Sequence, residues 1–250
     1  MTHTLSPLLI AVAVLYLTPW RSIGSQLRAW FFQARLALLV ARLSRDYARG
    51  RHCTILVFTG ALERATTFAL VRRIRAAPIH VPLVLVLDTT GGDMSAGLQL
   101  AHALAAHRGR VIVRVADECW SAGTIAAFGA DEIVLAPDAN LGFCDVIAHT
   151  DAGKIHTGPV MTGHTRGEAV DVVRSRHALR DVARSLAAAR EARGETPADA
   201  RALAERMTMS DADHWQPLFF EEARQLGLPV RVGPDPIWYE VVRLSIWANR

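Results

Sequence analysis

Apolar positions after residue 51 alternate between short continuous runs and longer stretches with helical spacing. Strands are expected at Cys53–Phe58, Val81–Leu87, Val111–Val115 and Glu132–Leu135, and helices at Ala61–Arg75, Met94–His107 and Ser121–Gly129. This alternation predicts an α/β fold with a largely parallel sheet. The unbroken apolar run Val81–Leu87 is typical of a strand that is covered on both faces.

The pattern weakens after Asn140 into a glycine-bearing stretch that runs to about Gly167. Further helices are expected at Glu168–Arg193, Pro197–Arg206, Phe219–Leu226 and Pro236–Trp247. The chain shows neither an internal repeat nor a low-complexity tract. We therefore assign residues 51–250 to one domain.

The first fifty residues have a different pattern. Leu5–Trp20 is apolar and uncharged, and five arginines follow at intervals of seven residues: Arg21, Arg28, Arg35, Arg42 and Arg49. A cleaved signal peptide would need a basic start and a small-residue cleavage site. We predict instead an uncleaved membrane anchor and a basic amphipathic linker helix over 1–50. The positive-inside rule then places the domain on the cytoplasmic side.

Composition narrows the class of protein. The chain has 250 residues, 51% of them hydrophobic and 21% charged, and a net charge of +4. These values exclude a disordered chain, a collagen-like repeat and a polytopic membrane protein. No nucleic-acid motif is present, so no nucleic-acid partner is expected. Three cysteines without a CxxC pair argue against a disulfide framework and a metal site, and we expect no cofactor.

A glycine turn, Asp88-Thr89-Thr90-Gly91-Gly92, follows the buried strand Val81–Leu87. Paired glycines allow backbone angles that other residues avoid, and they let a ligand approach the main chain closely. Free N–H groups in such a turn bind an oxyanion. The alternative interpretation is a tight strand-to-helix turn without a chemical role.

A serine turn, Trp120-Ser121-Ala122-Gly123-Thr124, opens the small-residue helix. Ser121 is either an N-cap residue or a nucleophile at a helix N-terminus, where the dipole favours developing negative charge. Both turns follow parallel strands, whose carboxyl ends share one edge of the sheet. The N–H groups of Gly91, Gly92 and Ala122 are therefore candidate donors to one carbonyl oxygen beside Ser121.

Two segments resemble the Clp/crotonase superfamily: LVLDTTGGDMSAGLQLAHAL, and WSAGTIAAFGADEIVLAPDANLG. With the apolar N-terminus, Pro137–Gly142 and the tail Glu221–Val230, they resemble the membrane-anchored serine dehydrogenase proteinase family. This resemblance implies a fold of repeated ββα units. It also implies Ser121 as the nucleophile, a peptide or protein substrate, and a homo-oligomer.

The general base departs from the family pattern. The Clp-type histidine falls at Cys144, seven positions after Pro137, and Cys144 is expected to be a buried structural thiol. Related membrane proteases use a lysine, but their position falls near Met161. The candidates are Lys154, which is the only lysine, together with His149 and His164. Asp145 and His214 also match residues common in the family.

Two functions remain open at this point. The first is a membrane-anchored serine peptidase with Ser121 as nucleophile and Lys154 or His149 as base. The second is a catalytically degenerate scaffold of the same fold that binds peptides or partner proteins. A crotonase-type hydratase would share the oxyanion donors but would not need a serine at the helix start.

Overall fold

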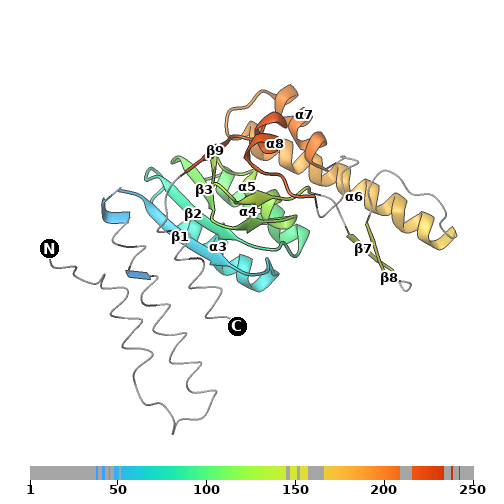
Figure 1. Ribbon diagram of the computed structural model, residues 1–250, viewed down its shortest axis with the longest axis horizontal. Helices are drawn as coiled ribbons and strands as arrows, with labels where there is room; N and C mark the ends of the chain where they lie inside the picture. The colour runs from blue at the N-terminus through green and yellow to red at the C-terminus, as the bar shows by residue number, and fades with distance from the viewer. Residues whose placement is uncertain are drawn as a thin grey trace, which may run out of the picture.

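The computed structural model describes residues 52–144, 147–150, 153–156, 166–208 and 216–233, with isolated residues from 38 to 50 and Trp238 and Val242. For 147–150, 153–156 and 166–176 only the backbone is described. Five parallel strands form the central sheet in the order β1-β2-β3-β5-β9. They are β1 Thr54–Thr59, β2 Leu83–Asp88, β3 Val111–Val115, β5 Glu132–Leu135 and β9 Val230–Val232. The predicted parallel α/β sheet is confirmed (Figure 1).

Helices connect the strands and cover the sheet (Figure 1). They are α3 Arg64–Ala76, α4 Met94–Ala105, α5 Ala122–Ala127, α6 Arg166–Glu191, α7 Pro197–Thr208 and α8 Phe220–Gln225. Their buried side chains join Leu83, Leu85 and Leu87 of β2 in one large core. Within that strand, Val86 faces the other way and packs with Trp238 and Val242. All six residues of β2 are buried, as the unbroken apolar run predicted.

Several short strands were not predicted from the sequence. They are β4 Glu118–Cys119, β6 Asn140–Leu141, β7 Ile147–Thr150 and β8 Gly153–His156, in addition to β9. β4 pairs with β6, and β7 pairs with β8 as an antiparallel hairpin separate from the main sheet. A ββα unit is seen at β3-β4-α5, whereas β1 and β2 each lead directly into a helix. Each has only two to four residues and, unlike β5, lacks a continuous apolar run.

The predicted membrane anchor, Leu5–Trp20, lies outside the described residues. Within the part of the chain that is described, no helix combines the length and the apolar character that crossing a membrane requires. The predicted C-terminal helix Pro236–Trp247 also lies largely outside, although Trp238 and Val242 are helical.

Candidate active site

The glycine turn follows β2 and has the backbone geometry that its sequence predicted. Gly91 has φ 103° and Gly92 has φ 144°, both in the region that favours glycine. The N–H of Gly91 donates to Thr89 Oγ1 over 3.1 Å. Thr89, which sequence reasoning had not singled out, therefore fixes the start of the turn.

The second half of the turn is anchored to the segment after β1. The N–H of Leu62 donates to the carbonyl oxygen of Gly91, and the N–H of Asp93 donates to that of Leu62, each over 2.8 Å. A Cβ at Gly92 would overlap the Leu62 carbonyl oxygen and lie 2.8 Å from its nitrogen. Gly92 is thus required by both its φ angle and its close packing.

The serine turn has a strained backbone. Ser121 has φ 48° and ψ −111°, and it is one of two non-glycine residues with positive φ among those described. Such angles cost about 1–3 kcal/mol and persist where the surroundings enforce them, often at active sites. The Ser121 side chain makes no capping hydrogen bond to α5. Ser121 is thus the N-cap residue of α5 by position, but its hydroxyl does not cap the helix.

Buried contacts enforce this conformation. Every residue of α5 is buried, and Gly123 packs so closely that a Cβ there would lie 2.8 Å from Cys119 Sγ. The hydroxyl of Thr124 donates to the carbonyl oxygen of Cys119 over 2.7 Å and accepts from the N–H of Gly142 over 3.2 Å. Thr124 thereby ties the helix to β4 and to the residue after β6.

The two turns meet at Ser121. A Cβ at Gly91 would lie 3.1 Å from Ser121 Cβ and 3.6 Å from the nitrogen of Ala122. The N–H groups of Gly92 and Ala122 have no acceptor within the described part of the chain, whereas that of Gly91 is taken by Thr89. Of the three predicted donors, two are therefore available. Gly91 contributes the space beside Ser121 instead.

The predicted bases occupy the separate hairpin. His149 lies on β7 and Lys154 on β8, and the antiparallel register places them directly opposite each other. His164, His214 and Asp145 lie outside the described residues. Cys144 is fully buried, and its N–H donates to the carbonyl oxygen of Met207 over 3.0 Å. The structure thus confirms that Cys144 is a buried thiol.

Asp88 is a titratable group that sequence reasoning missed. It ends β2, is 4% exposed, and accepts a 3.3 Å hydrogen bond from the N–H of Glu118. Its pKa is raised from 3.8 to about 6, chiefly by burial and also by the nearby carboxylates of Asp117 and Glu118, against main-chain hydrogen bonds that lower it. Burial and the charge of Asp88 also raise the pKa of the Cys119 thiol. The sequence signal for this group is an aspartate that directly follows an unbroken run of apolar residues.

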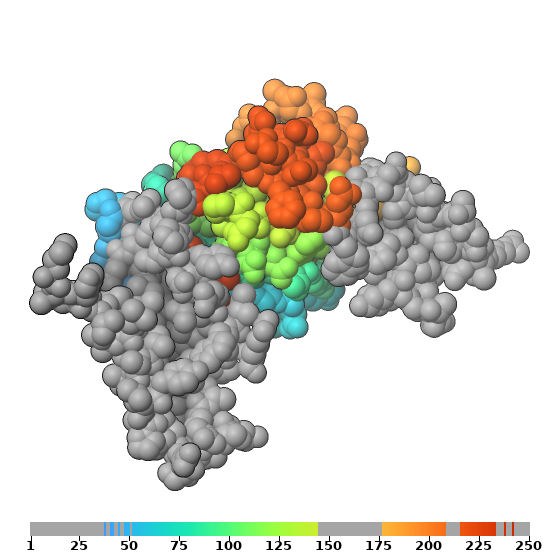
Figure 2. All heavy atoms as spheres, in the orientation of Figure 1, coloured from blue at the N-terminus to red at the C-terminus, as the bar shows by residue number. Residues whose placement is uncertain are grey.

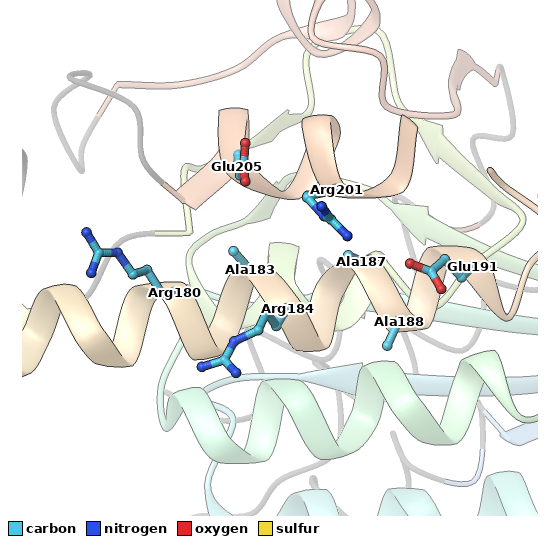
Figure 3. Close-up of a pocket in the computed structure, with 8 residues that line it drawn as sticks. All are labelled: Arg180, Ala183, Arg184, Ala187, Ala188, Glu191, Arg201 and Glu205. Carbon is cyan, nitrogen blue, oxygen red and sulfur yellow. The ribbon is translucent and has the colours of Figure 1, made fainter. Parts of the chain in front are cut away.

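No other described region offers comparable chemistry. The described residues contain no cluster of three His, Cys, Asp or Glu side chains that would hold a metal ion. A surface hollow of about 700 Å³ lies between α6 and α7 (Figure 3), where Arg201 points from α7 toward α6. Alanines, arginines and glutamates line it, and none of its residues belongs to the two turns.

Comparison with known proteins identifies the family. The profile of the ClpP-like SDH-type serine proteinases matches residues 62–245, which include both turns. The chain belongs to this family. It is a serine peptidase with a ClpP-like fold, as the resemblance implied.

Individual relatives are more distant. An uncharacterized protein of Methanocaldococcus jannaschii is 26% identical over 234 residues, which cover 84% of this chain and 79% of the relative. A lysine-to-alanine variant of the 1510-N membrane-bound stomatin-specific protease, in complex with a substrate peptide, is 22% identical with a TM-score of 0.51. That match covers 73% of this chain and 76% of the other. ClpP1 from Listeria monocytogenes has 15% identity and a TM-score of 0.47 over 78% of this chain and 99% of its own.

Proposed function

We propose that this serine peptidase is membrane-anchored and cleaves peptides or membrane-associated proteins through an acyl-enzyme on Ser121. The observation that carries the proposal is the strained Ser121 backbone at the start of α5, beside two N–H groups without an acceptor in the described chain. A serine that served only as a cap would not need this conformation.

The geometry supports a two-step acyl transfer. The Ser121 hydroxyl oxygen attacks the substrate carbonyl carbon while a base takes its proton, and the oxyanion accepts hydrogen bonds from Gly92 and Ala122. The base then returns the proton to the leaving amine as the C–N bond breaks. Water attacks the resulting ester by the same route and releases Ser121. Each such oxyanion donor typically contributes a factor of about 10²–10³ in rate.

We assign the base to Lys154, with His149 as the alternative. Both belong to one hairpin and stand opposite each other across it. A desolvated lysine acts as a base near neutral pH, whereas arginine keeps its proton. The 1510-N variant that was captured with a substrate peptide lacks a lysine, which favours the same residue type here.

Membrane attachment is the second part of the proposal. It is supported by the uncharged run Leu5–Trp20 and the arginines that follow it at intervals of seven. Being anchored on the cytoplasmic side would bring the domain close to membrane-associated substrates. The structurally similar 1510-N is a membrane-bound, stomatin-specific protease. We also propose that the chain forms a homo-oligomer.

Labelling with a fluorophosphonate tests the catalytic part. The wild-type chain should be labelled covalently at Ser121, and Ser121→Ala should lose both labelling and hydrolysis of a peptide reporter by several orders of magnitude. Ser121→Gly serves as a matched inactive variant. It should be more stable than Ser121→Ala by about 1 kcal/mol, because glycine adopts the positive φ without strain.

The labelling experiment also has a clear negative outcome. An inert wild-type serine, together with no hydrolysis of any reporter, would favour the degenerate scaffold over the peptidase mechanism. Anchoring is tested separately. The chain should stay in the membrane fraction during alkaline carbonate extraction. A reporter fused to its C-terminus should give the signal expected of a reporter in the cytoplasm. Release into the supernatant would refute the anchor without affecting the assignment of Ser121.

A further inference from the structure

Trp120 immediately precedes Ser121 and has no part in the mechanism above. We propose that its indole forms the wall of a subsite for a bulky apolar side chain on the acyl side of the scissile bond. The inference rests on the proposed role of Ser121. It adds a specificity-determining residue that the reaction chemistry itself does not require.

The indole is held in place before any substrate binds. Its Nε1–H donates to Glu118 Oε2 over 2.9 Å. The Trp120 main chain is fixed on both sides, because its N–H donates to the Thr89 carbonyl oxygen over 2.9 Å and its carbonyl oxygen accepts from the N–H of Gly123 over 2.7 Å. A side chain that is already ordered loses little conformational entropy on binding, which favours its use as a recognition surface.

The ring packs over Gly142. A Cβ at Gly142 would overlap Trp120 Cε3, and it would lie 3.2 Å from Trp120 Cδ2 and 3.3 Å from the nitrogen of Ser121. The indole and the Ser121 backbone therefore converge at Gly142, where the absence of a side chain leaves room for both. Trp120 itself is only partly buried.

Two glycines thus flank Ser121 with different neighbours. Gly91 lies on the side of Ser121 that faces the glycine turn, where Gly92 and Ala122 supply the N–H groups for the oxyanion. Gly142 lies on the side of Ser121 where the Trp120 indole packs. When the oxygen of the substrate carbonyl points toward the glycine turn, the acyl and leaving-group sides of the substrate point away from that turn. The acyl side chain is closer to the reacting carbon than any leaving-group side chain, so we place it against the indole.

The segment that contacts the indole at Gly142 is paired with a second segment, and neither carries a charge. Leu141 exchanges two main-chain hydrogen bonds with Leu218, of 2.9 and 2.8 Å. The next residue, Phe219, is 44% exposed. Figure 2 shows the yellow-green surface near residue 140 beside the orange-red surface that begins at residue 216. Residues 140–144 and 217–220 carry no charge, and the one carboxylate bonded to the ring, Glu118, occupies its polar edge. These features favour an apolar occupant.

Two esters with the same leaving group test the subsite. We compare kcat/KM for 4-nitrophenyl hexanoate and 4-nitrophenyl acetate, using the full chain in one detergent. The wild type should prefer hexanoate by about tenfold or more, and Trp120→Ala should reduce that preference to near unity. Trp120→Phe should retain most of it. Because both esters report on the same active population, partial unfolding does not alter the ratio.

Phe68→Ala is the matched control, because Phe68 is an aromatic residue on α3 that is 55% exposed. Its hexanoate-to-acetate ratio should equal that of the wild type. An unchanged ratio in Trp120→Ala, or an equal fall in Phe68→Ala, would overturn the subsite while the peptidase mechanism stands. A wild type that hydrolyses neither ester and resists fluorophosphonate would overturn both the mechanism and the subsite.

Discussion

The serine region and the hairpin region are built in different ways. Ser121, Gly92 and Ala122 belong to turns after β2 and β3 that are joined by main-chain hydrogen bonds and by close glycine packing. His149 and Lys154 belong to a two-stranded sheet that is separate from the central one, with β7 packed beside α6 (Figure 1).

This difference bears on the proposed mechanism. The positions of the proposed nucleophile and oxyanion donors follow from the backbone, so single atoms added at the glycines should disturb them. The hairpin fixes only the register of His149 against Lys154. The base proposed for this region is therefore distinguished by side-chain chemistry, and substitutions there should alter rates and pH dependence more than folding.

Replacement of the base should have the largest effect. Lys154→Ala is expected to lower kcat/KM for a peptide reporter by about 10³-fold, because general-base catalysis contributes about 10²–10⁴. Lys154→Arg should not restore activity, since arginine remains protonated. The measurement is steady-state hydrolysis, with circular dichroism to check the fold.

His149→Ala is the comparison variant, since His149 stands opposite Lys154 in the hairpin. It should retain activity within about tenfold of wild type, well short of the loss of a general base. The pH–rate profile gives an independent readout, because a histidine base would place the acidic limb near pH 6.5. Full activity in Lys154→Ala together with a large loss in His149→Ala would transfer the role to the histidine.

In the serine region, Gly92→Ala should destabilise the fold by about 2–4 kcal/mol. It combines the strain of a positive φ with overlap of the Leu62 main chain, which cannot move aside as a flexible side chain would. Gly60→Ala is the control, because Gly60 has φ 107° but nothing lies within 4 Å of its Cβ position. That variant should lose only about 1 kcal/mol. If chemical denaturation gave equal losses of unfolding free energy for Gly92→Ala and Gly60→Ala, the overlap with Leu62 would be unimportant.

Gly91→Ala should affect catalysis more than folding. The new Cβ would lie 3.1 Å from Ser121 Cβ and from the Trp120 carbonyl oxygen, so Ser121 must shift by a few tenths of an ångström. We expect kcat to fall by about 10–100-fold, because small misplacements of reacting groups are costly. The loss of unfolding free energy should match that of Gly60→Ala. Wild-type kcat in this variant would contradict the tight fit beside Ser121.

Four of the five central strands were predictable because they are continuous apolar runs that alternate with helices of regular spacing. The apolar run of β2 and the boundaries of β3 and β5 were recovered from the sequence, as was the start of α4. The short strands β4 and β6 escaped because they form only where other segments supply hydrogen-bond partners. Their pairing depends on contacts far apart in the chain, such as Gly142 with Cys119.

The site was predictable in part for the same reason. Residue types and spacing indicated Ser121 and the glycine turn, but they did not reveal that Thr89 occupies the N–H of Gly91. They also did not reveal the strain at Ser121, which arises from the buried packing of α5.

Asp88→Asn should have the smallest effect and should stabilise the protein. The pKa of Asp88 is raised from 3.8 to about 6, chiefly by burial, so the folded state binds a proton more readily than the unfolded state between those values. The free energy of unfolding therefore falls as pH rises from about 4 to 6, and the whole cost is present above pH 6. A pKa raised from 3.8 to about 6 sets an upper limit of about 3 kcal/mol on the gain at pH 8. Asparagine carries no charge and can still accept from the N–H of Glu118, but its amide NH₂ adds a buried donor, so we expect a gain of about 1 kcal/mol. At pH 4 the gain should vanish.

Asp138→Asn, at an exposed position, should leave stability unchanged at both pH values. If Asp88→Asn instead lowered stability at pH 8, the buried carboxylate would be needed in its charged form to hold β4 against the serine turn.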